Sequence, residues 1–139
     1  MIIGVRRLEA LPREESLRLL GSTSLGRVVF THLALPAIRP VNHIVENGKI
    51  LIRTHMGSAI VSAVDGTGTV VAYEADMIDP GDHLGWSVIV VGKASLLTDP
   101  VEIARYQQVL QPWLSGTMDD VIAITTDMVD GFRLTGEQA

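Results

Sequence analysis

The segment from residue 39 to residue 64 limits most strongly what this chain can fold into. It reads RPVNHIVENGKILIRTHMGSAIVSAV. Asn47 and Gly48 tolerate the positive φ angles of a two-residue hairpin turn, and the apolar residues 50–52 that follow are typical of a β-strand. A helix start is indicated at residue 58. The pattern therefore predicts a strand, a tight hairpin, a second strand, a short loop and a helix.

Arg53, Thr54 and Ser58 lie where the second strand ends and the helix begins. Ser58 is suited to cap the helix, and the backbone N–H groups of a helix start favour an anion such as phosphate. The charge of Arg53 at the strand end adds to this preference. Two interpretations stay open on the local pattern. One is a small phosphate pocket, and the other is an ordinary strand-to-helix connection in which Arg53 is a solvated surface charge.

Two further strand patterns carry information about sites. Pro40 lies inside the expected strand 37–45 and cannot donate to a ladder, so we expect an edge, a bulge or a parting of strands there, with backbone groups open to a ligand. The long strand that begins near Gly85 is apolar on both faces over residues 88–91. One face can line a barrel interior, while the other needs cover from a helix or a second subunit. Other strands are expected at residues 26–32, 69–76, 121–126 and 131–135.

Three helices are expected, at about residues 12–21, 58–64 and 100–110. Pro12 and Pro100 are expected at the first helical positions, and Asp99 supplies a cap for the third helix. Because six or so strands follow one another along the chain with these helices between them, the sequence predicts a mainly β (α+β) fold. We expect a six-stranded antiparallel barrel with flanking helices, formed by residues 1–139 as a single domain.

The composition argues against several classes of partner. The net charge is −5 and the basic residues are scattered, which argues against nucleic acid or an anionic membrane as the main partner. The chain has no cysteine, which excludes disulfides and thiolate chemistry. The apolar runs are too short to span a bilayer, and the first residues lack a signal-peptide layout, so we expect a cytoplasmic protein.

Catalytic motifs are not found in the sequence. The four histidines show no metal-ligand spacing with carboxylates, so we expect no metal site. The sequence also has no nucleophile elbow and no phosphate-binding glycine loop. We interpret His43 and His55 as surface or partly packed residues rather than catalysts. Trp86 opens the long strand, where it can pack or stack on a flat ligand. Chemistry alone therefore gives a β-barrel domain with one candidate anion site.

The order of segments over nearly the whole chain resembles the pyridoxamine 5′-phosphate oxidase-like family, whose fold is the FMN-binding split barrel. No single matching segment is specific, but their combination is. The matching residues are Leu8-Glu9-x-Leu11 with Arg13-Glu14-Glu15, Gly26-Arg27-Val28-Val29-Phe30-Thr31, Pro40-Val41-Asn42, Arg53-Thr54-x-x-Gly57-Ser58, Gly85-Trp86-Ser87-Val88, Pro112-Trp113 and Gly131-x-Arg133.

The resemblance implies a homodimer with two flavin sites at the subunit interface. In the family, the backbone of one strand contacts the flavin ring, three polar residues at a strand-to-helix connection hold the phosphate, and a tryptophan lies close to the cofactor or the dimer interface. In chain order, the corresponding residues are Pro40, Val41 and Asn42, then Arg53, Thr54 and Ser58, and finally Trp86. A second subunit would also cover the apolar outer face of the long strand.

Two positions depart from the family's pattern. Many relatives carry a lysine directly after the Gly-Ser, where this chain has Ala59, and a tyrosine where it has His43. Losing one charge-assisted contact to a phosphate costs about 1.5–3 kcal/mol, roughly a ten- to hundredfold loss in affinity. The deazaflavin F420, which related split barrels use, is therefore the alternative to FMN.

The resemblance implies two functions from different classes. The first is an oxidoreductase that uses FMN or F420 to move a hydride or electrons to a small organic substrate, with the cofactor carrying the chemistry. The second is a non-catalytic module on the same fold that sequesters or senses a ligand such as haem or flavin. Arg53, Thr54 and Ser58 favour the first function, and Ala59 favours the second.

Overall fold

A computed structural model gives the fold of the protein and describes residues 6–54, 59–64, 68–110 and 120–136. The elements in chain order are β1 (Arg6–Leu11), α1 (Arg13–Gly21), β2 (Leu25–His32), β3 (Leu35–Glu46), β4 (Lys49–Thr54), α2 (Ala59–Ala63), β5 (Thr69–Ile78), β6 (Gly85–Leu96), α3 (Pro100–Val109), β7 (Asp120–Thr125) and β8 (Met128–Gly136). Within these ranges, every helix is too short or too polar to cross a membrane.

Six antiparallel strands close into a barrel. The order in the sheet is β1-β8-β6-β5-β2-β3-β4-β7, and β6 also pairs with β7. These last pairs run from Ala94 with Ile124 to Leu96 with Ile122. They close the ring β6-β5-β2-β3-β4-β7 and confirm the six-stranded antiparallel barrel that the sequence predicts.

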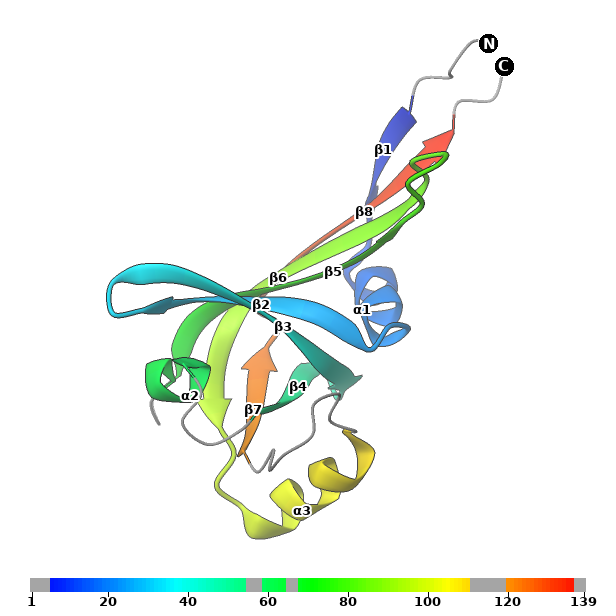
Figure 1. Cartoon of the computed structure of the whole chain (residues 1–139). Helices are drawn as coiled ribbons and strands as arrows, with labels where there is room; N and C mark the ends of the chain where they lie inside the picture. Colours follow the sequence, from blue (N-terminus) through cyan, green and yellow to red (C-terminus); the bar gives the residue numbers. More distant parts are fainter. Residues whose placement is uncertain (1–5, 55–58, 65–67, 111–119, 137–139) are drawn as a thin grey trace.

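β1 and β8 continue the sheet beyond the barrel (Figure 1). β8 pairs with the first half of β6, and β1 pairs with the outer edge of β8. We call β1, β8 and residues 76–87 of the β5–β6 hairpin the arm. β1 is not among the predicted strands, because its described side chains are exposed or half-buried and so give no buried face for a sequence pattern to reveal.

The barrel interior is filled mostly by aliphatic side chains, with Phe30 and Tyr73 among them, that alternate along the strands. The interior residues are Val28 and Phe30 of β2, Ile50 and Ile52 of β4, Val71, Tyr73 and Ala75 of β5, Val88, Val90 and Ala94 of β6, and Ile122 and Ile124 of β7. A second cluster lies between the barrel wall and α3 and contains Leu51, Tyr106, Leu110, Val121 and Ala123. This second core lies on the opposite side of β4 and β7 from the barrel interior and holds α3 to the barrel.

The local signals in the sequence are mostly confirmed. Asn47 and Gly48 have φ angles of 52° and 72° and join β3 to β4. Asp99 caps α3 by accepting a hydrogen bond from the Val101 N–H at 3.0 Å. Pro12 is the N-cap of α1 rather than its first helical residue.

His43 is buried in the core, so the interpretation of this residue as a surface or partly packed histidine is wrong. Its Nε2 lies 2.8 Å from the Leu20 carbonyl oxygen, to which it donates, and its Nδ1 accepts from the Tyr73 hydroxyl at 2.5 Å. Both ring nitrogens therefore have partners without water. Burial lowers the pKa of His43, against the opposing effect of the Leu20 carbonyl, and favours the neutral ring. His55 lies outside the described residues.

Gly26 makes room for the ring of Tyr73. A Cβ added at residue 26 would lie 2.5 Å from two carbons of that ring. We predict that Gly26→Ala lowers the free energy of unfolding by about 1–3 kcal/mol, the usual cost of overpacking a core. Urea denaturation measures the change. Gly136→Ala is the control, because its added Cβ would come no closer than 3.9 Å to Leu84. Equal stability of the two variants would contradict the prediction.

Candidate functional site

Five of the seven predicted site residues meet where β3 and β4 part. The strand pairs run from Glu46 with Lys49 to His43 with Ile52 and end there. Beyond this point, residues 40–42 pair with β2 on one side and have no strand on the other among the described residues. We call residues 40–42 of β3 and 53–54 of β4 the fork. The parting of strands expected near Pro40 is therefore confirmed.

Arg53 and Thr54 point to opposite sides of the barrel wall. Thr54 is buried and follows the interior residues of β4, whereas Arg53 is half-buried on the side of α3. The Arg53 Nη1 donates to the carbonyl oxygens of Gln107 and Leu110, at 2.8 and 3.1 Å. A cation on the last carbonyls of a helix is favoured by the helix dipole. Arg53 therefore stabilises the end of α3, and the description of it as a solvated surface charge is wrong.

Asp120 lies directly across from Thr54 in the pairing of β4 with β7. Its Oδ2 is a buried side-chain oxygen that has no hydrogen-bond partner in the part of the chain that the structure describes. A buried carboxylate oxygen costs free energy until a donor reaches it. The hydroxyl groups of a ribityl chain are such donors, and the positive charge of Arg53 suits a phosphate. The residues of the fork, together with Asp120 beside it, therefore fit a flavin.

Of the two remaining predicted residues, the structure places one, Trp86, and it lies away from the fork. Ser58 is outside the described residues, while Ala59 begins α2 and is half-buried against the core. Trp86 is half-buried on the arm, where it pairs with Met77 and Arg133. In the sheet order, β6 is three strands away from β3. One copy of the chain therefore does not bring Trp86 to its own fork.

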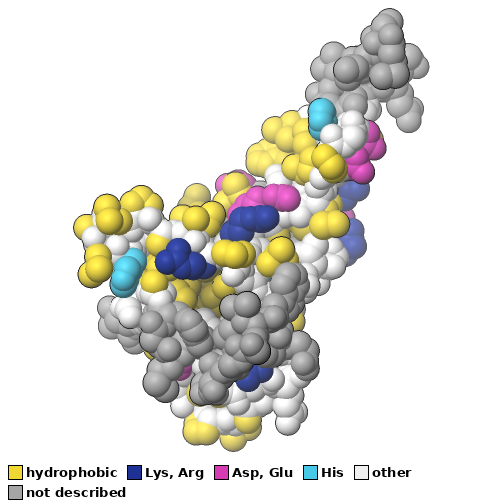
Figure 2. Space-filling model, in the orientation of Figure 1, with side chains coloured by type: hydrophobic (Ala, Val, Ile, Leu, Met, Phe, Trp, Pro, Cys, Tyr) yellow, Lys and Arg dark blue, Asp and Glu magenta, His cyan; other side chains and the backbone are white. Residues whose placement is uncertain are grey.

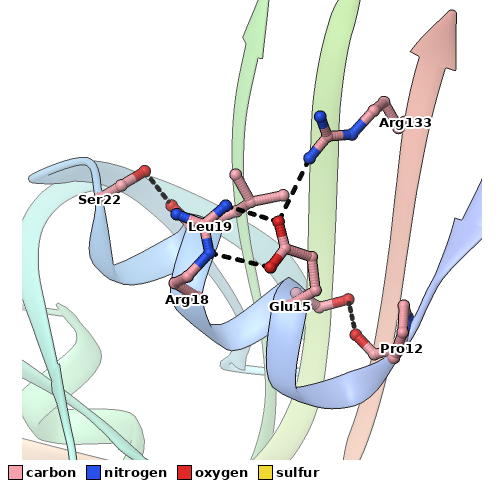
Figure 3. A network of polar contacts seen from close by, with 7 residues as sticks. Pro12, Glu15, Arg18, Leu19, Ser22 and Arg133 are labelled. Atoms are coloured by element: carbon pink, nitrogen blue, oxygen red, sulfur yellow. Dashed lines mark hydrogen bonds and ion pairs between the residues drawn. The ribbon is translucent and has the colours of Figure 1, made fainter.

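Arg133, part of the family-like motif, joins α1 to the arm (Figure 3). Glu15 Oε1 accepts hydrogen bonds from Arg18 Nη2 at 2.5 Å and from Arg133 Nη2 at 3.3 Å. The hydrogen bond from Arg18 lowers the pKa of Glu15. Next to this network the helix lies so close to β8 that a Cβ on Gly131 would come 2.7 Å from the Ser16 Cβ. The ion pairs and this contact hold α1 on the arm.

A charged group that was not predicted from the sequence lies on the outer face of β2 and β5. Arg27 Nη1 lies 3.1 Å from Glu74 Oε1, and Asp76 follows on the same face of β5. Burial, then the neighbouring Asp76, raises the pKa of Glu74 to about 7, although Arg27 lowers it. Acids two residues apart on a strand are the signal that could have indicated this group, since they share one face.

An open pocket of about 350 Å³ lies beside this charged group. Its lining residues are Ser22, Thr23, Ser24, Leu25, Arg27, Asp76 and Met77. Figure 2 shows acidic and basic side chains next to one another on this side of the molecule, with hydrophobic side chains around them. The outer face therefore combines a central charged group with an apolar surround.

The raised pKa of Glu74 predicts a pH-dependent stability. Between its ordinary value of 4.5 and about 7, Glu74 binds more protons in the folded state than in the unfolded state. The free energy of unfolding therefore falls as the pH rises through this window. We predict that Glu74→Gln removes this fall, as measured by urea denaturation at several pH values. The lowered pKa of His43 makes the free energy of unfolding rise with pH instead, and it does so in both proteins. The difference between their two pH profiles therefore reports on Glu74 alone.

Glu102→Gln is the control for this measurement, because Glu102 is an exposed acid on α3. It should keep the pH profile of the unchanged protein. A Glu74→Gln variant with that same profile would contradict the prediction.

The chain is similar to known proteins in sequence and in structure. The sequence model of the family described as pyridoxamine 5′-phosphate oxidase matches residues 12–135. An uncharacterised protein of Mycobacterium tuberculosis is 47% identical over 135 residues, which cover 95% of this chain and 89% of that protein. A candidate pyridoxamine 5′-phosphate oxidase of Corynebacterium glutamicum is similar in structure, with a TM-score of 0.76, 31% identity, and coverage of 94% of this chain and 96% of the other.

An FAD-binding protein of Mycobacterium smegmatis is also similar in structure. It has a TM-score of 0.69 and 30% identity, over 91% of this chain and 98% of the other. The family match, these full-length similarities and the closed six-stranded barrel agree with one another. The chain therefore belongs to the pyridoxamine 5′-phosphate oxidase family and has its flavin-binding split-barrel fold.

Proposed function

We propose that the protein is a cytoplasmic, homodimeric oxidoreductase that binds FMN at the fork and acts on a small organic substrate. The observation that carries this proposal is the geometry of the fork. It combines residues of β3 that have no strand beside them among the described residues, the cationic side chain of Arg53 and, next to the fork, a buried Asp120 oxygen for which the described residues supply no donor, in a chain of this family. These are the groups that a ring, a phosphate and a polyhydroxyl chain require.

Each part of the fork has a role in this proposal. The backbone of residues 40–42 orients the ring by hydrogen bonds. The Thr54 hydroxyl and the Asp120 carboxylate bind the ribityl chain. Arg53 lies on the other side of the wall and acts on the phosphate at the end of β4 through its charge, without leaving α3. The bound flavin supplies hydride or electron transfer, while the protein binds it, orients it and excludes water. No protein side chain need act as an acid or base.

The outer face of the barrel supports the homodimer. Val88 and Val90 of β6 are fully buried inside the barrel, whereas Ile89 between them is 45% exposed on the outside. The sequence predicts that this outer face needs cover, and a second copy would supply it. A second copy would also bring its own Trp86 toward the fork, which one copy alone does not do.

Three cofactors are consistent with the fork. FMN follows from the family resemblance, F420 from the alanine at residue 59, and FAD from the Mycobacterium smegmatis relative. All three carry a ring, a polyhydroxyl chain and phosphate. The groups at the fork therefore match what the three cofactors have in common.

The second candidate function is a binding module that holds flavin or haem without turnover. Ala59 favours it, because a cation that many relatives have is missing. The Arg53 contacts favour it as well, since Nη1 is already engaged by α3. Both features weaken phosphate binding. They leave the apolar interior and the strand edge of the fork unchanged.

The test for turnover uses the protein with bound FMN. The complex is reduced chemically without oxygen and then mixed with a quinone such as menadione. For an oxidoreductase, we expect the visible spectrum of the oxidised flavin to return faster than for the same concentration of free reduced FMN. A slower return than in free solution would favour the binding module.

We predict that Ala59→Lys tightens FMN binding about tenfold. A cation in the first turn of α2 would add one charge-assisted contact to the phosphate, worth about 1.4 kcal/mol after its ordering cost. Fluorescence titration measures the dissociation constant. Riboflavin is the ligand control, because it lacks the phosphate and should bind equally to both proteins.

Ser62→Lys is the matched protein control. It adds the same charge to an exposed position in the last turn of the same helix. It should leave FMN affinity within about twofold of the unchanged protein, as is usual for a solvated charge. Equal FMN affinity of all three proteins would mean that no phosphate binds at the start of α2.

A further inference from the structure

The tip of the β2–β3 hairpin, residues 32–38, is an exposed apolar projection. It extends away from the barrel in Figure 1, and hydrophobic side chains cover the same end of the molecule in Figure 2. Leu33, Leu35 and Ile38 are 83%, 67% and 55% exposed. Leu35 and Ile38 lie on opposite faces of the hairpin, because side chains alternate along a strand. The tip is therefore apolar on both faces.

The two central residues of the turn at this tip have backbone conformations that are energetically unfavourable for their residue types. His32 pairs with Leu35, so Leu33 and Ala34 are the two central residues, with φ angles of 52° and 64°. Side chains with a Cβ disfavour this left-handed region, which asparagine and glycine tolerate. The next hairpin has the same kind of turn and uses Asn47 and Gly48. One chain thus contains the low-cost turn at one hairpin and a strained, exposed leucine at the other.

The arm carries the surface that matches the tip. Met77 and Ile78 are 60% and 41% exposed at the end of β5. Met77 also lines the open pocket beside the charged group, together with Leu25. An apolar side chain from outside would cover Met77 and bury its own surface at the same time.

The charges of the two ends are complementary. The sequence THLALPAIR around the tip contains Arg39 and no acid, whereas the hairpin of the arm carries Asp76, Asp79 and Asp82. Arg39, Asp79 and Asp82 are exposed. The tip and the arm project from one barrel in different directions (Figure 1). A two-fold dimer in which each tip contacts the arm of the other copy would contain two equal contacts.

We propose that the hairpin tip is a self-association anchor, in which Leu33 and Leu35 of one copy pack on Met77 and Ile78 of a second copy. The inference rests on the homodimer of the proposed function and names the contact that stabilises it. Dimer formation buries the leucines and compensates for the strained turn. The anchor therefore weakens the isolated chain while it strengthens the pair.

The double substitution Leu33→Asn/Ala34→Gly tests this opposition. It copies the residues of the second hairpin, so the turn itself becomes easier to form. We expect the dimer dissociation constant from analytical ultracentrifugation to rise at least tenfold. The urea midpoint, measured at a concentration where both proteins are monomeric, should rise or stay equal. A turn with only a structural role would change the midpoint and leave association unchanged.

Two more variants fix the location of the contact. Val101→Asn removes an equally exposed apolar side chain, 76% exposed on α3, and should leave the dissociation constant unchanged. Met77→Ser should weaken association, and the loss in the combined variant should be smaller than the sum of the two separate losses, because the two changes affect one shared contact. Additive losses, or no loss for Met77→Ser, would overturn the assignment of the arm as acceptor.

The outcomes separate this inference from the proposed function. An unchanged protein that is monomeric at micromolar concentration would overturn both the homodimer and the anchor. A dimer that the tip substitutions leave intact would overturn the anchor alone. A monomer that sediments with phosphatidylcholine vesicles through its tip would mean that the tip binds lipid instead. FMN titration of the same proteins is an independent measurement that concerns the cofactor only.

Discussion

The change of neighbour halfway along β6 is the constraint on which the rest of the structure depends. Over its first half β6 lies beside β8, and from Ala94 onward it lies beside β7. Gly92 is at the change, where a Cβ would meet the backbone carbonyl of Thr125. The Lys93 N–H then donates to the Thr125 Oγ1 at 2.9 Å. Because glycine allows this close approach, one strand can serve both the arm and the barrel.

The two partings of strands divide the molecule by role. β6 leaves β8 to close the barrel, and β3 leaves β4 to open the fork. The barrel between them is filled with aliphatic side chains, which gives the fork a rigid frame. The groups that suit a cofactor lie at the end of that frame, while the apolar surfaces lie on the arm and at the hairpin tip. The interior of the barrel thus serves stability, and the groups proposed for binding lie at its end and on its projections.

Local signals allowed much of the fold to be predicted. Asn47 with Gly48, and Asp99 with Pro100, act on the nearest few residues, so their effect is written in the sequence around them. Pro40 indicated the parting of strands for the same reason, since it lacks an N–H. The barrel itself came from the order of strands and from the family resemblance.

Long-range contacts explain what sequence reasoning missed. His43 is buried because Leu20 and Tyr73, 23 and 30 residues away, provide its two partners. Arg53 contacts the end of α3, 54 and 57 residues further on. No pattern around either residue contains this information. The arm residue Trp86 shows the same limit, since its distance from the fork depends on how four strands are ordered in the sheet.

The contact of His43 with Leu20 and Tyr73 links folding to the pH of the solution. It joins α1, β3 and β5, so it exists only when these three elements have come together. Before that, the imidazole is solvated and binds a proton below about pH 6.5. Burial favours the neutral form, so a ring that is protonated in the unfolded chain loses its proton as the core forms. In mildly acidic solution, closing of the barrel is therefore coupled to the release of a proton.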